Sequence, residues 1–265
     1  MQPVPHLLLT DVVALAREAG AAILDVYAGE FDVTKKGDDS PLTIADLRAH
    51  RIIAAGLARL APGVPVISEE AAVPPLAERA HWEWLWLVDP LDGTREFVER
   101  SGEFTVNIAL IRGHAAVLGV LHVPLTGVDY FAAIGSGAFR QGRDGVAARI
   151  APRSRIDGRP RVVASRSHRG SRLDGFFARL GPHEFRPLGS AAKFGLVADG
   201  SADLYPRVGP TSEWDTAAGQ AIAEIAGARV VGRDGAPLAY NARDTLINPD
   251  FVCYADPSRP WHTYL

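Results

Sequence analysis

The sequence predicts an α/β protein whose N-terminal half is α+β and whose C-terminal half is α/β. Two observations carry this prediction. Helical spacing of apolar residues near the start is followed by closely spaced strand-like segments, which are typical of an antiparallel sheet. From residue 161 onward, strand-like and helical segments alternate. The change in pattern predicts two domains, residues 1–155 and residues 156–265.

Two helices are predicted in the first 60 residues. Apolar side chains recur at helical spacing from about residue 7 to 27. Residues 32–42 are polar, contain Gly and Pro, and predict a β-hairpin or a mobile loop. Thr43 and Asp46 then have the spacing of a capping box, which predicts the start of a second helix. Asp46 taken alone is a capping residue, although the same fixed position at a helix end also suits a catalytic carboxylate.

The segment 82–97 carries the strongest local signal. Its first half is an aromatic and aliphatic run typical of a buried strand. Asp89 and Asp92 follow, three residues apart, around a proline and before a glycine, so a turn is expected. We expect Thr94 to be the N-cap of a short helix that begins near Arg95. Two carboxylates and a backbone carbonyl then meet beside helix N–H groups, which suits a hard cation and phosphate oxygens.

The other predicted elements follow from the same patterns and from turn residues between them. In chain order, those of the first half are a short strand over 64–67, strands over 104–111, 117–123 and 128–134, and short pieces over 135–141 and 146–150, followed by a connection over 151–160. Those of the second half are a strand over 161–164, a helix to 180, a helix from Gly189-Ser190 through 197 with Lys193 in its first turn, a strand over 202–205, and a helix from Trp214 to about 226.

Composition excludes several classes of function. The chain has 265 residues, of which 47% are hydrophobic and 22% charged, and its formal net charge is −3. A broad basic face for nucleic acid is therefore not expected. Cys253 is the single cysteine, so no intramolecular disulfide is possible. No apolar run approaches a membrane span and no signal peptide is evident. We expect a cytoplasmic protein, with peripheral association at the inner membrane as the alternative.

Acidic residues stand at the ends of four predicted elements. They are Asp46, the pair Glu69 and Glu70, the pair Asp89 and Asp92, and Asp215. Each segment alone is explained by capping or turn chemistry. Because successive strand residues point to opposite faces, one of the two glutamates is expected to reach a shared site. Like charges ~4 Å apart repel by ~4 kcal/mol at an effective dielectric constant near 20. Several convergent carboxylates therefore predict bound cations.

Three of these segments resemble the signature of the inositol monophosphatase superfamily of metal-dependent phosphatases. They are Glu69-Glu70, the D-P-L-D-G-T segment from Asp89 to Thr94, and the W-D-T-A-A-G segment from Trp214 to Gly219. Other segments are similar to the CysQ-type 3′(2′),5′-bisphosphate nucleotidases within it. These are S-P-L-T-I-A-D at 40–46, D-G-T-R-E-F at 92–97, G-E-F-T-V-N-I-A-L at 102–110, S-R-S-H at 165–168 and L-Y-P-R at 204–207. The segment 189–193 departs from the pattern, because relatives tend to have a second Ser and a Leu there.

The resemblance implies a layered αβαβα sandwich and a Mg²⁺-dependent phosphomonoesterase. The activity implied is hydrolysis of the 3′-phosphate of 3′-phosphoadenosine 5′-phosphate, a step linked to sulfate assimilation, with inhibition by lithium. It implies two or three Mg²⁺ ions held by Glu69, Asp89, the carbonyl of Leu91, Asp92 and Asp215. It assigns catalytic roles to Asp46, Thr94 and Glu69, of which Asp46 and Thr94 would orient the attacking water. In these terms residues 1–155 would bind most of the metal, while residues 156–265 would add nucleotide specificity and one metal ligand.

Substrate identity depends on other side chains, since a metal site recognises only phosphate. The expected substrate-binding residues are Glu69, Leu91, Asp92, Gly93, Thr94, Ser167, His168, Ser190, Lys193, Arg207 and Asp215, with Arg166 as a further candidate. Inositol monophosphate and fructose 1,6-bisphosphate are alternative substrates with the same metal chemistry. A non-catalytic nucleotide sensor is the alternative from another class. The assembly is expected to be a monomer or a homodimer.

Overall fold

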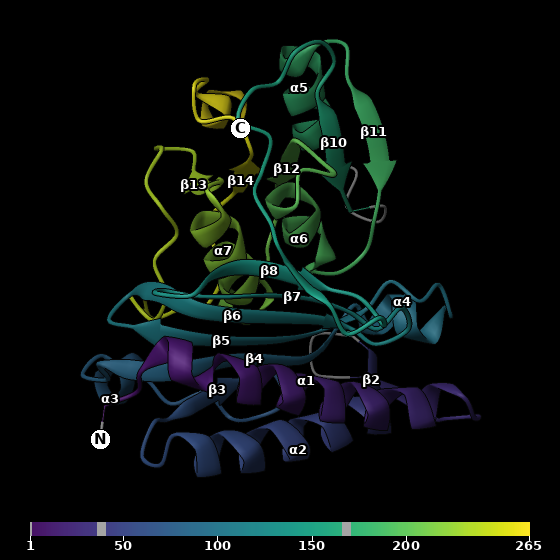
Figure 1. Ribbon diagram of the computed structural model, residues 1–265, viewed down its shortest axis with the longest axis vertical. Coiled ribbons are helices and arrows are strands. Elements are labelled where there is room, and N and C mark those ends of the chain that lie inside the picture. Colours follow the sequence, from purple (N-terminus) through teal and green to yellow (C-terminus); the bar gives the residue numbers. More distant parts are fainter. Residues whose placement is uncertain (1, 36–40, 166–170) are drawn as a thin grey trace.

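Helices and sheets alternate in five layers along the long axis of the structure (Figure 1). The structure is a computed structural model that describes residues 2–35, 41–165 and 171–265. The layers are a helix pair, a seven-stranded sheet, a second helix pair, a five-stranded sheet and an outer helical layer. This arrangement confirms the predicted α/β class and the layered αβαβα sandwich.

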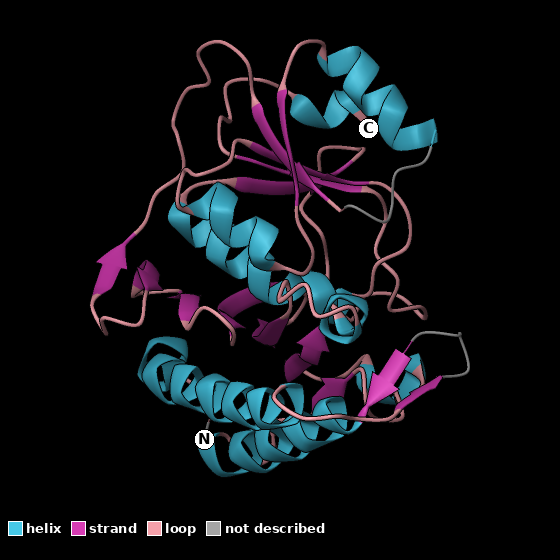
Figure 2. Cartoon of the chain, turned by 90° about the vertical axis from the view of Figure 1, so that its right-hand side faces the viewer, coloured by secondary structure: helices cyan, strands magenta, loops and turns pink. Residues whose placement is uncertain are grey.

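The first layer consists of α1 (Pro5–Tyr27) and α2 (Ile44–Leu60), which lie side by side beneath the large sheet (Figures 1 and 2). Both have an apolar face, as their helical spacing predicted. Strands β1 (Val33–Lys35) and β2 (Pro41–Thr43) form an antiparallel hairpin between them. The predicted hairpin and the predicted helix start after Thr43 are therefore confirmed.

The seven-stranded sheet has the strand order β3-β4-β5-β6-β7-β8-β9. All neighbouring strands are antiparallel except β3 and β4, which are parallel. The strands are β3 (Val66–Ser68), β4 (Trp84–Asp92), β5 (Thr105–Arg112), β6 (Ala115–Val123), β7 (Val128–Ala133), β8 (Gly137–Gln141) and β9 (Ala147–Arg149), and the short helices α3 (Leu76–Arg79) and α4 (Thr94–Val98) flank β4.

The period-two alternation of β4 and β5 decides which residues face which layer. Trp86 and Ile108 are buried against the α1/α2 layer. Leu87 and Ala109 are buried on the opposite face, against helix α7 (Glu213–Ala226). Asp89 continues the alternation begun by Leu87, so its carboxylate lies on the face toward α7. The alternation of β4 therefore places the Asp89 carboxylate between the two sheets.

The second sheet has the order β11-β10-β12-β14-β13. Helices α6 and α7 lie between the two sheets, and α5 and η1 cover the outer face (Figures 1 and 2). The elements of this half, in addition to α7, are β10 (Arg161–Ala164), α5 (Ser171–Leu180), β11 (Glu184–Pro187), α6 (Ala192–Ala198), β12 (Leu204–Arg207), β13 (Arg229–Gly232), β14 (Phe251–Tyr254) and η1 (Trp261–Tyr264).

The structure differs from the sequence prediction in a few elements. Strands β11, β13 and β14 were not predicted, because each has only four residues and no periodic pattern of its own. Strand β12 includes Pro206 and Arg207, which were predicted as loop. Helix α6 begins at Ala192 and not at Gly189, because Ser190 has a positive φ of 52°. Among the described residues, no helix is long and apolar enough to cross a membrane.

Candidate active site

Three carboxylates from three elements converge at one end of the seven-stranded sheet. One oxygen each of Glu69, Asp89 and Asp215 lies within 4.8 Å of the others. Glu69 follows the end of β3, Asp89 lies near the end of β4, and Asp215 is in the first turn of α7. Oxygen atoms this close fit the ligand preference of a hard divalent cation. The structure therefore brings together three of the acids that the sequence singled out.

The turn after Asp89 is shaped by local interactions. The register of β4 against β5 shifts between Asp89 and Asp92, and the Leu91 N–H donates to Oδ1 of Asp89 at 3.0 Å. Gly93 has a φ of 93°, and a Cβ there would lie 2.9 Å from the Glu103 carbonyl oxygen. Only glycine accepts both conditions without strain. The turn thus requires the residue that the sequence places there.

Gly93, and not Thr94, is the N-cap of α4, so the predicted cap was wrong. The left-handed backbone of Gly93 moves Thr94 into the first helical position. There the Thr94 hydroxyl lies 3.3 Å from Oδ1 of Asp46 and 3.2 Å from the Leu91 carbonyl oxygen. Because Thr94 does not cap the helix, its hydroxyl can contact the Asp46 carboxylate and the Leu91 carbonyl at once.

Asp46 does cap a helix, as its sequence context predicted. Its Oδ2 accepts from the backbone N–H of Thr43 at 2.8 Å and from the Thr43 hydroxyl at 2.7 Å. The side chain is 1% exposed. Capping occupies one carboxylate oxygen, and the other oxygen contacts Thr94. Asp46 therefore caps α2 and contacts Thr94 at the same time.

Asp215 is held by a second capping box. Its Oδ2 accepts from the Thr211 hydroxyl at 2.6 Å and from the Ser212 N–H at 2.8 Å. Burial, together with the charges of Asp92 and Glu69, raises the pKa of Asp215 to about 7. Burial also raises the pKa of Asp89 well above its usual range, helped by the charges of its acidic neighbours. In the absence of cations, these raised pKa values favour the protonated forms of the Asp89 and Asp215 carboxyl groups.

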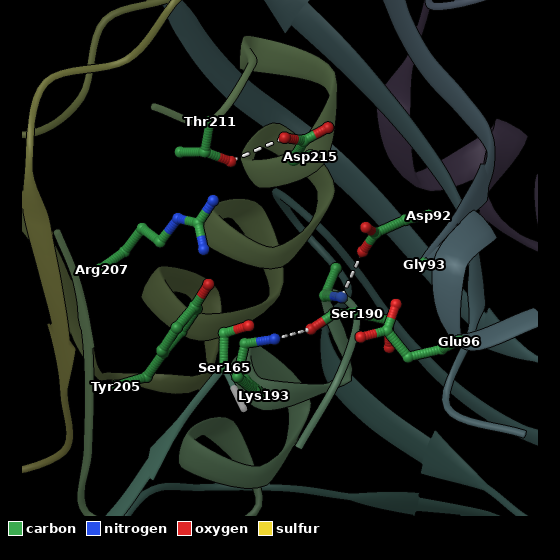
Figure 3. A pocket seen from close by; sticks show the side chains of 11 residues that line it. Asp92, Gly93, Glu96, Ser165, Ser190, Lys193, Tyr205, Arg207, Thr211 and Asp215 are labelled. Atoms are coloured by element: carbon green, nitrogen blue, oxygen red, sulfur yellow. Dashed lines mark hydrogen bonds between the residues drawn. The ribbon is translucent and has the colours of Figure 1, made fainter. Parts of the chain in front are cut away.

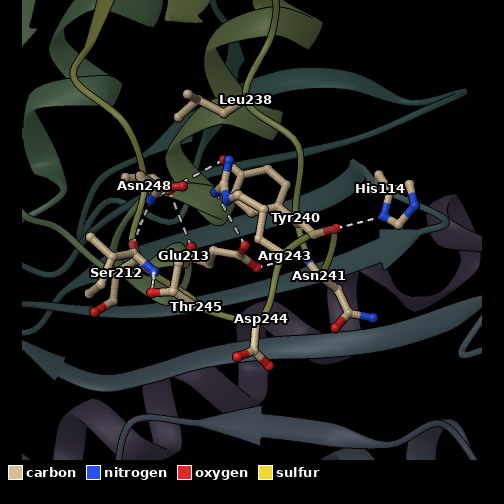
Figure 4. Close-up of polar contacts among 12 residues, drawn as sticks. His114, Ser212, Glu213, Leu238, Tyr240, Asn241, Arg243, Asp244, Thr245 and Asn248 are labelled. Carbon is tan, nitrogen blue, oxygen red and sulfur yellow. Dashed lines mark hydrogen bonds and ion pairs between the residues drawn. The ribbon is translucent and has the colours of Figure 1, made fainter. Parts of the chain in front are cut away.

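A buried polar network fixes the start of α7 (Figure 4). Oε2 of Glu213, the first residue of α7, accepts from the Asn241 N–H at 2.6 Å. The Asn248 amide donates to the Ser212 carbonyl at 2.8 Å. Nη1 of Arg79, which is 1% exposed, donates to Oδ1 of Asn241 at 2.6 Å. Arg79 belongs to α3, which follows the Glu69 loop, so the network links two of the segments that carry carboxylates.

The Asp92 carboxylate contacts the segment that precedes α6. Its Oδ2 accepts from the Ala191 N–H and lies 3.4 Å from the Thr105 hydroxyl. Burial raises the pKa of Asp92, while Lys193, the Ala191 N–H and the Asn107 amide act in the opposite direction. Asp92 thus joins the large sheet to the second helix layer.

A pocket opens between Asp92 and Asp215 (Figure 3). Its wall carries cations opposite these carboxylates. Burial lowers the pKa of Lys193 to about 8, although Asp92 opposes the shift. Nη2 of Arg207 donates to the Pro210 carbonyl at 2.7 Å, while its buried Nε has no hydrogen-bond partner among the described residues. The lining residues are Asp92, Gly93, Glu96, Ser165, Ser190, Ala191, Lys193, Tyr205, Arg207, Thr211 and Asp215.

Most residues predicted for the site lie in this region. Arg166, Ser167 and His168 lie outside the described residues. Sequence reasoning missed Thr211, which the capping spacing before Asp215 could have indicated. It also missed Tyr205 and Glu96 as site residues, although both lie in segments that carry the family resemblance, because the pocket forms only when the two sheets pack.

A model of the inositol monophosphatase family matches residues 6–259. The chain belongs to that family. It is 50% identical over 248 residues to the 3′(2′),5′-bisphosphate nucleotidase CysQ of Escherichia coli (strain K12), covering 92% of this chain and 98% of the relative. The family assignment predicted from Glu69-Glu70 and the two D-containing motifs is confirmed.

Solved structures of this family have the same fold. CysQ from Bacteroides thetaiotaomicron is 40% identical and superimposes with a TM-score of 0.78, covering 93% of this chain and 96% of that one. An IMPase of Thermotoga maritima is 25% identical with a TM-score of 0.76, covering 92% and 90%. Each superposition covers at least 92% of this chain, so the structural similarity includes both halves of the fold.

Proposed function

We propose that this protein is a Mg²⁺-dependent phosphomonoesterase that hydrolyses the 3′-phosphate of 3′-phosphoadenosine 5′-phosphate to AMP and phosphate. The observation that carries the proposal is the convergence of Glu69, Asp89 and Asp215 oxygens within 4.8 Å, beside the Asp46–Thr94 pair. Half of the sequence is shared with curated nucleotidases that are named for such an activity.

The donor set fits magnesium. It consists of carboxylate oxygens, which hard cations prefer. Burial, followed by the charges of neighbouring carboxylates, raises the pKa values of Asp89 and Asp215, and bound cations would offset both effects. We assign Glu69, Asp89, the Leu91 carbonyl, Asp92 and Asp215 to two or three Mg²⁺ ions. Bound magnesium supplies Lewis-acid stabilisation of phosphoryl oxygens and a bound water of lowered pKa.

The chain's own groups have separate roles in this proposal. The Thr94 hydroxyl orients the attacking water, and Oδ1 of Asp46 takes up a proton through it. Glu69, one oxygen of which lies within 4.8 Å of oxygens of Asp89 and Asp215, is assigned as the third catalytic residue. As the water oxygen bonds to phosphorus, the ester bond to the 3′-oxygen breaks. That oxygen takes a proton from solvent, and Asp46 later returns its proton to solvent. No nucleophilic side chain is needed.

Specificity is assigned to the wall of the pocket that carries cations. Lys193 and Arg207 lie opposite Asp92 and Asp215, where they can receive a second phosphate or the adenosine. Ser190, together with Ser167 and His168, completes the proposed substrate contacts, and the last two lie outside the described residues. The domain roles predicted for residues 1–155 and 156–265, and a cytoplasmic location, belong to the same proposal.

A phosphate-release panel tests the function. Purified protein is assayed with 3′-phosphoadenosine 5′-phosphate, inositol 1-phosphate and fructose 1,6-bisphosphate, each with Mg²⁺ and with EDTA. We expect the highest kcat/KM on the nucleotide, dependence on Mg²⁺, and collapse of turnover in Asp92→Asn. A higher kcat/KM on inositol 1-phosphate would reassign the substrate, and tight nucleotide binding without turnover would make the protein a sensor.

A variant pair tests the specificity wall. Arg207→Met is expected to raise KM for the bisphosphate nucleotide about tenfold or more, because a charge-assisted contact is lost. Its matched control is Arg59→Met, which removes an exposed arginine at the end of α2. Equal KM values in the two variants would remove Arg207 from the proposed site.

A further inference from the structure

Asn107 is a buried polar residue that local structure does not explain. It lies within β5, its side chain is 0% exposed, and neither Nδ2 nor Oδ1 has a hydrogen-bond partner among the described residues. Its chain neighbours Val106 and Ile108 are buried apolar residues. An unpaired buried amide costs free energy that an apolar residue of the same shape would not. Contacts within the sheet therefore do not explain why this position carries a polar side chain.

The register of the sheet places Asn107 in the site. It pairs directly with Asp89 on β4, and Thr105, two residues earlier, pairs with Asp92. Side chains of directly opposed residues in an antiparallel pair lie on the same face with Cβ atoms roughly 4.5–5.5 Å apart. Asn107 thus stands beside Asp89 on the face toward α7, where Asp215 also lies.

The Asp92 carboxylate lies on the same part of the sheet, opposite Thr105. Oδ2 of Asp92 is approached by the Ala191 N–H from the α6 side and by the Thr105 hydroxyl from β5. Donors from both sides of the pocket therefore restrict the orientation of this one carboxylate.

We propose that Asn107 is a positioning residue for the cation site: its amide donates to Asp92 and orients that carboxylate, while its Oδ1 accepts from a water of the hydrated cation cluster. This inference rests on the proposed function. It accounts for both unpaired atoms at once, since the donor and the acceptor gain partners when cations and their waters are present. Partners that orient metal ligands typically contribute 10–100-fold in metal affinity.

The test compares three proteins by calorimetric titration with Mg²⁺ and by thermal unfolding in EDTA. Asn107→Leu keeps the approximate shape and removes both polar atoms. We expect its Mg²⁺ dissociation constant to rise 10–100-fold, while its unfolding temperature in EDTA stays equal or rises. At saturating Mg²⁺, its KM for the nucleotide is expected to stay within about threefold of wild type, because Asn107 does not contact substrate.

Ile108→Val is the matched control. It alters the next residue of β5, which is buried against α1 and α2 on the other face. We expect a small loss of thermal stability and a Mg²⁺ dissociation constant within about twofold of wild type. If Asn107→Leu does not fold, Asn107→Thr, a β-branched residue suited to a strand, replaces it with an expected loss of affinity of about fivefold or more.

Two results would overturn the inference. One is Mg²⁺ affinity of the Asn107 variant within threefold of wild type, and the other is an equal loss in Ile108→Val. Both leave the proposed phosphatase standing, because wild type still binds Mg²⁺ and releases phosphate. If wild type neither binds Mg²⁺ nor releases phosphate, the proposed function fails and this inference fails with it.

Discussion

The Thr94 hydroxyl lies 3.3 Å from Oδ1 of Asp46, although 48 residues separate them in the chain. The contact exists because Gly93 takes over the helix cap and because Asp46 is fixed by its own capping box. Two backbone devices thus place a hydroxyl and a carboxylate side by side. We propose that the Thr94 hydroxyl orients a water and that the Asp46 carboxylate accepts its proton.

Removing the Thr94 hydroxyl is expected to slow the chemical step. Thr94→Val keeps the side-chain shape and removes the link to Asp46, so kcat should fall about 10²–10³-fold, with KM changed less than about threefold. Steady-state assays at saturating Mg²⁺ measure both parameters. Thr94→Ser, which keeps the hydroxyl, is the control and should retain most of the activity. More than a tenth of wild-type kcat in Thr94→Val would contradict the assignment.

The stability of the metal-free protein is expected to decrease as pH rises from about 5 to 8. The pKa of Asp215 is raised to about 7, and that of Asp89 is raised well above its usual range. The folded state then binds more protons than the unfolded state, so the stabilisation is fully present below pH ~4 and is lost as pH rises through the folded pKa values. Urea unfolding in EDTA at several pH values measures the trend.

Magnesium should reverse this trend, since cations bind the ionised carboxylates and shift the folding equilibrium by mass action. Asp215→Asn, which can still cap α7, should flatten the decline in EDTA and reduce the stabilisation by Mg²⁺. A decline of the same slope in Asp215→Asn would show that other groups cause it.

Gly93→Ala is expected to lower both the stability of the folded protein and its catalytic activity. A Cβ would meet the Glu103 carbonyl at 2.9 Å in a backbone conformation with a φ of 93°. We expect a loss of about 1–3 kcal/mol in the free energy of unfolding and a fall in kcat, because Asp92 and Thr94 flank the residue. Gly63→Ala is the comparison, since Gly63 also has a positive φ but no atom lies within 4 Å of its Cβ. Equal losses in both variants would assign the effect to φ alone.

Arg79→Met is expected to cost about 3 kcal/mol or more in the free energy of unfolding. The buried guanidinium donates to Asn241 and to the Arg243 and Asp244 carbonyls, and these groups would lose their partner. Urea unfolding measures the loss, with Arg59→Met as the exposed control. A loss below 1 kcal/mol would contradict a role for Arg79 in fixing the start of α7.

Sequence reasoning reached the fold class and the principal acids for physical reasons. Helical spacing, strand alternation and capping chemistry are local, so α1, α2 and the strands from β4 to β7 could be predicted with nearly their observed bounds. The acids Glu69, Asp89 and Asp215 stand at element ends, where capping and turn chemistry mark them. The family resemblance added their grouping, and the structure brings their oxygens together.

Tertiary structure decided what local chemistry leaves open. The four-residue strands β11, β13 and β14 exist because the second sheet supplies their neighbours, and no periodicity of their own specifies them. The N-cap of α4 is Gly93 and not Thr94, and the Glu103 carbonyl, which occupies the space where a Cβ would be, requires glycine at that position. In the sequence, Asn107 is a single polar residue within an apolar strand. Only its pairing with Asp89 across the sheet places it beside the site, since strand register is decided between distant segments and not within one.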